Sequence, residues 1–269
     1  MGNLFLGLFW AVLLIATDNS PPVLLTAQEH PWGNFLPNSW RIVQTVTVAN
    51  VDGQTIQSQR IVRTTLADVD NEGITLQESE TLNLSGRPVE KIPQTLKHDF
   101  FQELIQENVQ ISQGVPVKLT IGRKVVPCDV RIYEQQTSGG RLTTTIWYTP
   151  HVYPYILRVE RIQRAPAEGP NGVGPIIRQS VTLVQETSAL HTIRSSRRSR
   201  TYTLQTVERA GNITKITDAR CSWDVPGGLL ESTTREFDGQ NREVRRSVAK
   251  MTNYSSFERI PGTTTRQQR

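Results

Sequence analysis

Residues 40–69 read WRIVQTVTVANVDGQTIQSQRIVRTTLADV, and this stretch indicates how the chain folds. Apolar residues alternate with threonine and arginine from Trp40 to Val48, which is the two-residue period of a half-buried strand. Asp52 and Gly53 interrupt the alternation, and both residue types tolerate the positive φ of a tight hairpin turn. The pattern resumes at Ile56, so we predict an antiparallel hairpin.

The same signature recurs along most of the chain. Threonine, valine, isoleucine and arginine are abundant, and turn signals such as Ser138-Gly139-Gly140 and Asp238-Gly239 separate the alternating runs. The hydrophobic content of 36% suits a sheet that keeps one face wet. We therefore predict a mainly β fold, a large curved antiparallel sheet or half-barrel meander of about 11 to 13 strands.

One segment breaks the pattern. Phe101, Leu104 and Ile105 fall at helical spacing, and Asp99 is a suitable N-cap residue. We predict one main α-helix over about 99–109, packed on the concave side of the sheet.

The first residues differ from the rest. Leu4 to Ala16 is an uncharged apolar run of the length of a signal-peptide core, too short to span a membrane comfortably. We expect residues 1–27 to be a signal peptide or an N-terminal anchor, with Ala27 the best candidate for the last residue removed. Residues 28–258 then form a single antiparallel β domain, and 259–269 a flexible tail. Export to the periplasm or cell envelope, or to the extracellular space, follows.

The basic character of the chain is local. The net charge is +5. The surplus of basic over acidic residues lies after Thr187, where arginines alternate with acidic residues along expected strands. Cross-strand ion pairs explain that mixture, and no recognition motif accompanies it, so we predict no nucleic-acid partner.

Cys128 and Cys221 are the two cysteines, and each lies in an expected strand on the side that carries apolar residues. Export would allow a disulfide between them, and two buried free thiols are the alternative. No catalytic, metal-binding or phosphate-binding motif accompanies them, so we assign no catalytic residue, no metal and no cofactor.

Two aromatic groups and one basic run are the candidate sites. WGNFLPNSW, from Trp32 to Trp40, is either a ligand platform or a plug for one end of the sheet, and the plug is the simpler interpretation. Trp147, Tyr148, His151 and Tyr155 either rim a pocket or pack at a strand end. Arg194, Arg197, Arg198 and Arg200 could contact phosphate, an acidic polysaccharide or anionic lipid, or form a solvated hairpin loop.

Two short stretches carry a family resemblance. His30-Pro31-Trp32-Gly33 and Val225-Pro226-Gly227-Gly228 resemble an uncharacterised family of exported bacterial β-rich proteins. More distantly, the strand-helix-strand layout is similar to the lipoprotein-localisation carriers, whose half-barrel holds acyl chains, although those carriers have more helices. The resemblance implies a lipid or another envelope component as partner, and it implies no oligomeric state.

The resulting hypothesis is a non-enzymatic envelope binding or structural protein that holds an apolar or amphipathic ligand. One alternative is a hydrolase or lyase acting on envelope polymers, with His151 or His191 in a cleft. The other is an adhesive module that binds acidic polymers through the basic loop.

Overall fold

The computed structural model describes residues 24–51, 53–84, 87–105, 108–166, 173–193 and 197–257. These residues form fifteen strands and one short 3₁₀ turn, η1 (Ala27–Glu29). The strands of the first half are β1 (Trp40–Val51), β2 (Gln54–Val69), β3 (Ile74–Leu84), β4 (Arg87–Glu90), β5 (Gln94–His98), β6 (Val109–Gln113) and β7 (Val117–Ile121). Those of the second half are β8 (Lys124–Thr137), β9 (Gly140–Tyr148), β10 (Ile156–Arg164), β11 (Ile176–Ile193), β12 (Arg197–Ala210), β13 (Ile213–Ser222), β14 (Leu229–Phe237) and β15 (Glu243–Ser255).

All strands join one antiparallel sheet, as predicted, although there are more of them than the 11 to 13 expected. The path runs β4-β3-β2-β1-β15-β14-β13-β12-β11-β10-β9-β8-β6, with β5 beside β3 and β7 beside β8. The β1–β2 hairpin turns at Gly53, whose φ is +77°. The additional strands are short edge pieces, such as β4, whose four residues are too few to show an alternation.

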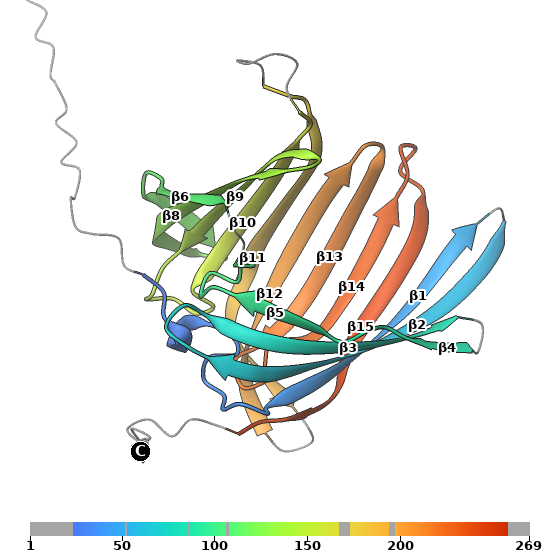
Figure 1. Ribbon diagram of the computed structural model, residues 1–269, viewed down its shortest axis with the longest axis horizontal. Coiled ribbons are helices and arrows are strands. Elements are labelled where there is room, and N and C mark those ends of the chain that lie inside the picture. Colours follow the sequence, from blue (N-terminus) through green and yellow to red (C-terminus); the bar gives the residue numbers. More distant parts are fainter. Residues whose placement is uncertain are drawn as a thin grey trace, which may run out of the picture.

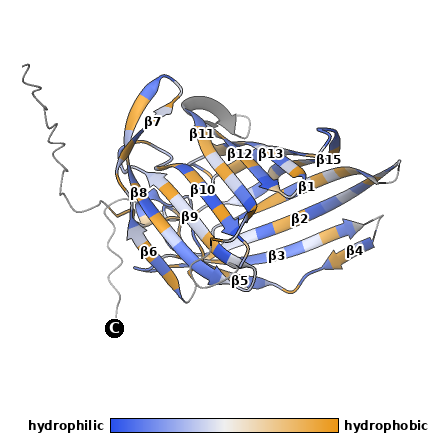
Figure 2. Ribbon diagram, turned by 90° about the horizontal axis from the view of Figure 1, so that it is seen from above, coloured by the Kyte–Doolittle hydropathy of each residue, from blue (hydrophilic) through white to orange (hydrophobic). Residues whose placement is uncertain are grey.

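The first and last long strands are neighbours in the sheet. β1 pairs with β15 from Trp40↔Ser255 to Ala49↔Arg245, so the two ends of the described chain are held together in the middle of the sheet. The sheet curves strongly, and from above β3 and β5 lie across from β11 and β12 (Figures 1 and 2). The free edges of the sheet lie at β5 and β6, and residues 99–105, which follow β5, form a crossover, or strap, that reaches over the inner face.

Direct cross-strand pairs share one face of an antiparallel sheet, so the register separates the two faces. The inner face, as we call it, carries Tyr133, Thr144, Arg161 and Ser180 in adjacent strands, and the crossover packs on it. The outer face carries Trp40, Val46 and other alternate residues. Side chains on most of both faces are only half-buried, because the sheet is largely a single layer.

Apolar packing is concentrated in three clusters, two of which lie where the N-terminal segment and the crossover meet the inner face. Trp32 and Phe35 pack with Leu66, Ile74 and Leu76 in one cluster. A second cluster joins Leu25 and Phe101 to Tyr133, Ile146 and Tyr148. The segment 24–39 therefore plugs one end of the curved sheet, in keeping with the simpler interpretation of the aromatic run.

The predicted helix over 99–109 is wrong. Asp99 does cap backbone N–H groups, but those of Phe101 and Glu103, within a turn that closes through an Asp99 N–H to Glu103 carbonyl bond of 2.8 Å. Gln102 adopts φ +67° and Asn108 φ +62°, which a right-handed helix does not accommodate. Of the apolar residues at helical spacing here, only Phe101 is buried against the inner face, and it belongs to an irregular strap.

No helix in the described part of the chain has the length and apolar character needed to cross a membrane.

Candidate functional site: a hollow beneath the crossover

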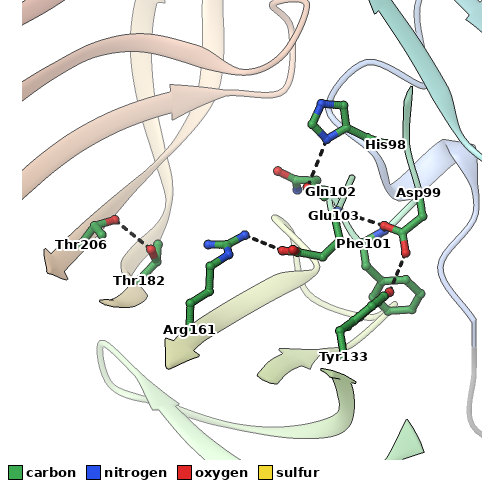
Figure 3. A network of polar contacts seen from close by, with 9 residues as sticks. All are labelled: His98, Asp99, Phe101, Gln102, Glu103, Tyr133, Arg161, Thr182 and Thr206. Atoms are coloured by element: carbon green, nitrogen blue, oxygen red, sulfur yellow. Dashed lines mark hydrogen bonds and ion pairs between the residues drawn. The ribbon is translucent and has the colours of Figure 1, made fainter. Parts of the chain in front are cut away.

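The crossover is fixed to the inner face by a polar network around Asp99 (Figure 3). The Tyr133 hydroxyl donates to Asp99 Oδ2 at 2.6 Å, and Arg131 Nε donates to the Tyr133 oxygen at 2.9 Å. Together with the two backbone N–H groups that Asp99 accepts, these bonds satisfy both of its carboxylate oxygens. Burial, followed by the bond to Asp99, raises the pKa of Tyr133, so this hydroxyl remains a donor.

A second link joins the crossover to β10. Arg161 Nη2 donates to Glu103 Oε1, and the glutamate side chain is only 17% exposed. Burial raises the pKa of Glu103, and Arg161 opposes that rise. His98 lies in the same network, with Nδ1 3.2 Å from the Gln102 carbonyl oxygen. Asp99 and Glu103 of the strap are therefore both engaged by other groups of the protein.

Three connected cavities lie along the inner face beside the strap, and we call them together the hollow. The cavity under the strap measures about 350 Å³, and it shares Leu142 and Arg161 with a neighbouring cavity of about 450 Å³. A smaller one of about 90 Å³ is joined to these through Gln102 and Thr182. The largest of the three is lined by Leu142, Arg161, Gln163, Arg178, Ser180, Thr182, Thr206 and Glu208.

The inner face also has a row of hydroxyl groups that crosses seven neighbouring strands. Direct pairing connects each member to the next, and every member is half-buried. Three adjacent pairs are hydrogen-bonded through their side-chain oxygens, at 2.8 Å for Thr47 with Ser247, 2.8 Å for Thr182 with Thr206, and 2.9 Å for Thr217 with Thr234. From β2 to β11 the row is Ser58, Thr47, Ser247, Thr234, Thr217, Thr206 and Thr182.

The rows of side chains on either side of this hydroxyl row differ in polarity. Toward the plug, the next row contains Ala249, Ser232, Ala219, Leu204 and Val184, which are small or apolar. Away from the plug, the next row is charged and internally paired, with Arg245 to Glu236 and Lys215 to Glu208. Arg178 also pairs with Glu208, at 2.7 Å. The inner face therefore passes from apolar to hydroxyl to ionic along the strands.

The six aromatic and histidine residues expected to bind a ligand are not gathered in one pocket. Trp32 is buried in the plug beneath Arg41, and Tyr148 is fully buried edge-to-face with Phe101 at 4.8 Å between ring centroids. Tyr155 packs with Tyr153 and Trp223 at the same end.

The remaining three lie elsewhere. Trp40 and Trp147 are on the outer face, stacked with Arg63 and Arg158 respectively. His151 is exposed in the loop between β9 and β10. None of the six lines the hollow.

The basic run is at the hairpin between β11 and β12. The backbones of Arg197, Arg198 and Arg200 belong to β12 and pair with β11. Arg194 lies outside the described residues, as do the side chains of the other three and of His191. The anion-binding role of the run stays a prediction.

The possible disulfide is wrong, because Cys128 and Cys221 are both free and buried. Cys128 is on β8 and Cys221 on β13, with four strands between them, so the separation is roughly 24 Å along the sheet. A disulfide needs Cα atoms within about 7 Å. Burial raises the pKa of each thiol to about 11, so both remain protonated. The described residues contain no group of His, Cys, Asp and Glu placed to hold a metal ion.

Comparison with known proteins identifies no family for this chain. No protein family and no curated protein matches its sequence. Among solved structures, a "putative exported protein with YmcC-like fold" from Bacteroides fragilis is 8% identical, with a TM-score of 0.32 over 82% of this chain and 99% of that one.

Two further structures are similarly distant. A "putative outer membrane lipoprotein-sorting protein domain" from Vibrio parahaemolyticus is 10% identical, with a TM-score of 0.35 over 85% of this chain and 88% of that one. A "putative lipoprotein" from Parabacteroides distasonis is 9% identical, with a TM-score of 0.32 over 84% and 98%. By description, the three are an exported protein, a lipoprotein-sorting domain and a lipoprotein.

Proposed function

We propose that this chain is an exported, non-enzymatic binding protein of the periplasm or cell envelope, and that its ligand occupies the hollow beneath the crossover. The observation that carries the proposal is the set of connected cavities on the inner face, which has the volume of a small-molecule site. The strap packs over the first of these cavities through Gln102, Glu103 and Leu104 without filling it.

The chemistry of the hollow favours binding over catalysis. Asp99 accepts hydrogen bonds on both oxygens, and Glu103 is paired with Arg161. Both carboxylates therefore hold the strap to the sheet, and the larger cavity is lined by hydroxyl, amide and paired ionic groups. The apolar cavity of 90 Å³ is one fifth the size of the 450 Å³ cavity, so a ligand with a large apolar part fits poorly.

The test is to purify the exported protein and to identify, by native mass spectrometry, the compound that co-purifies with it. We expect a bound small molecule in the natural protein and its loss from Ser180→Trp, because an indole at this position fills the larger cavity. Thr233→Trp, on the outer face, is the matched control and should keep the ligand. A ligand retained by Ser180→Trp, or a protein that never carries one, would refute the proposal.

The hydrolase alternative has one supporting observation, which is that His98 and Glu103 line the same 350 Å³ cavity. It predicts hydrolytic or lyase activity on envelope polymers that Glu103→Gln abolishes. Turnover of such a substrate by the natural protein would favour it over simple binding.

A further inference from the structure

We propose that the ligand of the hollow is a neutral sugar or short neutral oligosaccharide, recognised by Thr182, Thr206, Ser180 and Gln163. This inference rests on the proposed function and adds the chemical class of the ligand and the residues that select it.

The first argument is charge balance. The 450 Å³ cavity contains the guanidinium groups of Arg161 and Arg178, and each is paired with a glutamate, Glu103 and Glu208 respectively. Each guanidinium therefore already has an acidic partner within the protein, and Glu208 is shared by Arg178 and Lys215. A charged ligand would have to displace an existing partner, whereas a neutral ligand leaves both ion pairs intact. The hollow therefore favours a molecule without net charge.

The second argument is the supply of hydrogen-bonding groups. Thr182 and Thr206 share one hydrogen bond at 2.8 Å, so one of their two hydroxyl protons is left to donate elsewhere, and acceptor lone pairs remain on both oxygens. Ser180 and Gln163 line the same cavity, and within the described part of the chain their side chains form no hydrogen bond. Half-buried donors and acceptors without partners are suited to a ligand that supplies both.

The third argument is the spacing. Ser180, Thr182 and Thr206 lie on two adjacent strands, about 5 Å apart across the sheet and about 7 Å along it. A ligand must therefore present several donor-acceptor groups within a few ångströms of each other, as the vicinal hydroxyls of a sugar do. Leu142 and the ring of Tyr133 contribute apolar surface at the neighbouring cavity for the C–H face of such a ring.

An acyl chain does not meet these conditions. A methylene chain in the 450 Å³ cavity would leave Ser180 and Gln163 without partners and would separate them from water, which costs free energy at each group. The hollow thus selects against the ligand that the half-barrel layout alone would suggest.

The experiment titrates the purified full-length protein with glucose, galactose, N-acetylglucosamine, cellobiose and chitobiose, using calorimetry or protein-observed NMR. We expect saturable binding of at least one sugar. Thr182→Val and Thr206→Val should each weaken it at least tenfold, because each removes a hydroxyl and keeps the side-chain shape. Thr233→Val makes the same change on the outer face and should bind as the natural protein does. Thermal denaturation confirms that each variant is folded.

The outcomes distinguish a failure of the sugar inference from a failure of the proposed binding function on which it rests. If no sugar of the panel binds and the co-purified compound is a fatty acid or phospholipid lost from Ser180→Trp, the sugar inference fails and the binding function stands. If a sugar binds equally well to Thr182→Val and Thr206→Val, the assignment of these residues fails. If neither sugars nor amphiphiles bind and nothing co-purifies, the binding function itself fails.

Discussion

Threonine sets both the local structure and the chemistry of this protein. Its β-branched side chain favours strands, and its hydroxyl can occupy a face that is neither dry nor freely solvated. In β1, Thr45 and Thr47 face inward whereas Val46 and Val48 face outward. The alternation correctly predicts the strand, but it does not say which parity lies inside, because a single-layer sheet leaves both faces half-buried.

One buried residue makes the stability of the protein depend on pH. His30 is 3% exposed, and its Nδ1 accepts a hydrogen bond from the Trp32 backbone N–H at 3.2 Å. Burial, with a smaller contribution from His98, lowers the pKa of His30 from 6.5 to about 3. In the unfolded chain His30 is therefore protonated below about pH 6.5, whereas in the folded chain it stays neutral down to about pH 3.

We expect this contribution to stability to be fully present above pH 6.5 and to be lost as the pH falls toward 3. In that window the free energy of unfolding should decrease by about 1.4 kcal/mol per pH unit on account of His30. His30→Asn retains an acceptor for the Trp32 N–H and cannot take up a proton. The free energy of unfolding of this variant, measured by urea denaturation, should therefore fall less steeply with decreasing pH. His151→Asn, which changes an exposed histidine, should keep the slope of the natural protein. Equal slopes for both variants would contradict the assignment.

At the scale of elements, the strap between β5 and β6 shows how tertiary contacts override a local pattern. The spacing of Phe101, Leu104 and Ile105 matches a helix, yet only Phe101 is buried, and Leu104 and Ile105 are 42% and 45% exposed. The strap is a tight turn in which the Glu103 carbonyl accepts from the Asp99 N–H, and Leu104 then pairs back with His98 of β5. Sequence reasoning does not identify this turn, because contacts of Phe101 and Glu103 with distant strands hold it, and only the fold brings those strands together.

Phe101 is the residue that holds the strap down. It lies edge-to-face on Tyr148 and beneath the guanidinium of Arg131, whose Cζ atom is 4.5 Å from the ring centroid. We expect Phe101→Ala to lower the free energy of unfolding by about 3 to 5 kcal/mol, because it leaves a cavity under the strap. Phe257→Ala removes the same ring from a side chain that is 51% exposed and should change stability by about 0.5 kcal/mol at most. Urea denaturation measures both, and equal effects would show that the strap is not anchored by this ring.

At the scale of the whole molecule, the hollow is assembled from distant parts of the sequence. Its walls come from the strap near residue 100, from β6 and from β8 to β12. Sequence patterns predict the strands, the hairpins and the plug, because these depend on neighbouring residues. The hydroxyl row depends on the register of seven strands, and neither the register nor the facing of each strand can be inferred without the pairing partners.

The N-terminal segment gives the last prediction, since the structure includes residues that cleavage after Ala27 would remove. Leu25 is 3% exposed and packs with Phe101 and Tyr148. The Thr26 N–H and hydroxyl donate to Glu29 Oε2 at 2.7 and 2.6 Å. A Cβ on Gly33 would lie 1.6 Å from the Ala27 carbonyl oxygen, so the chain packs closely against this residue.

We therefore expect the exported protein to retain Leu25 to Ala27, with processing at or before Leu24, a residue that is 58% exposed. Intact-mass measurement of the exported protein locates the N-terminus directly. A variant that begins at Gln28 should be less stable by about 2 to 5 kcal/mol, as for the loss of a buried leucine, whereas one that begins at Leu24 should match the exported protein in urea denaturation. A mature chain that starts at Gln28 with undiminished stability would show that the plug does not need these residues.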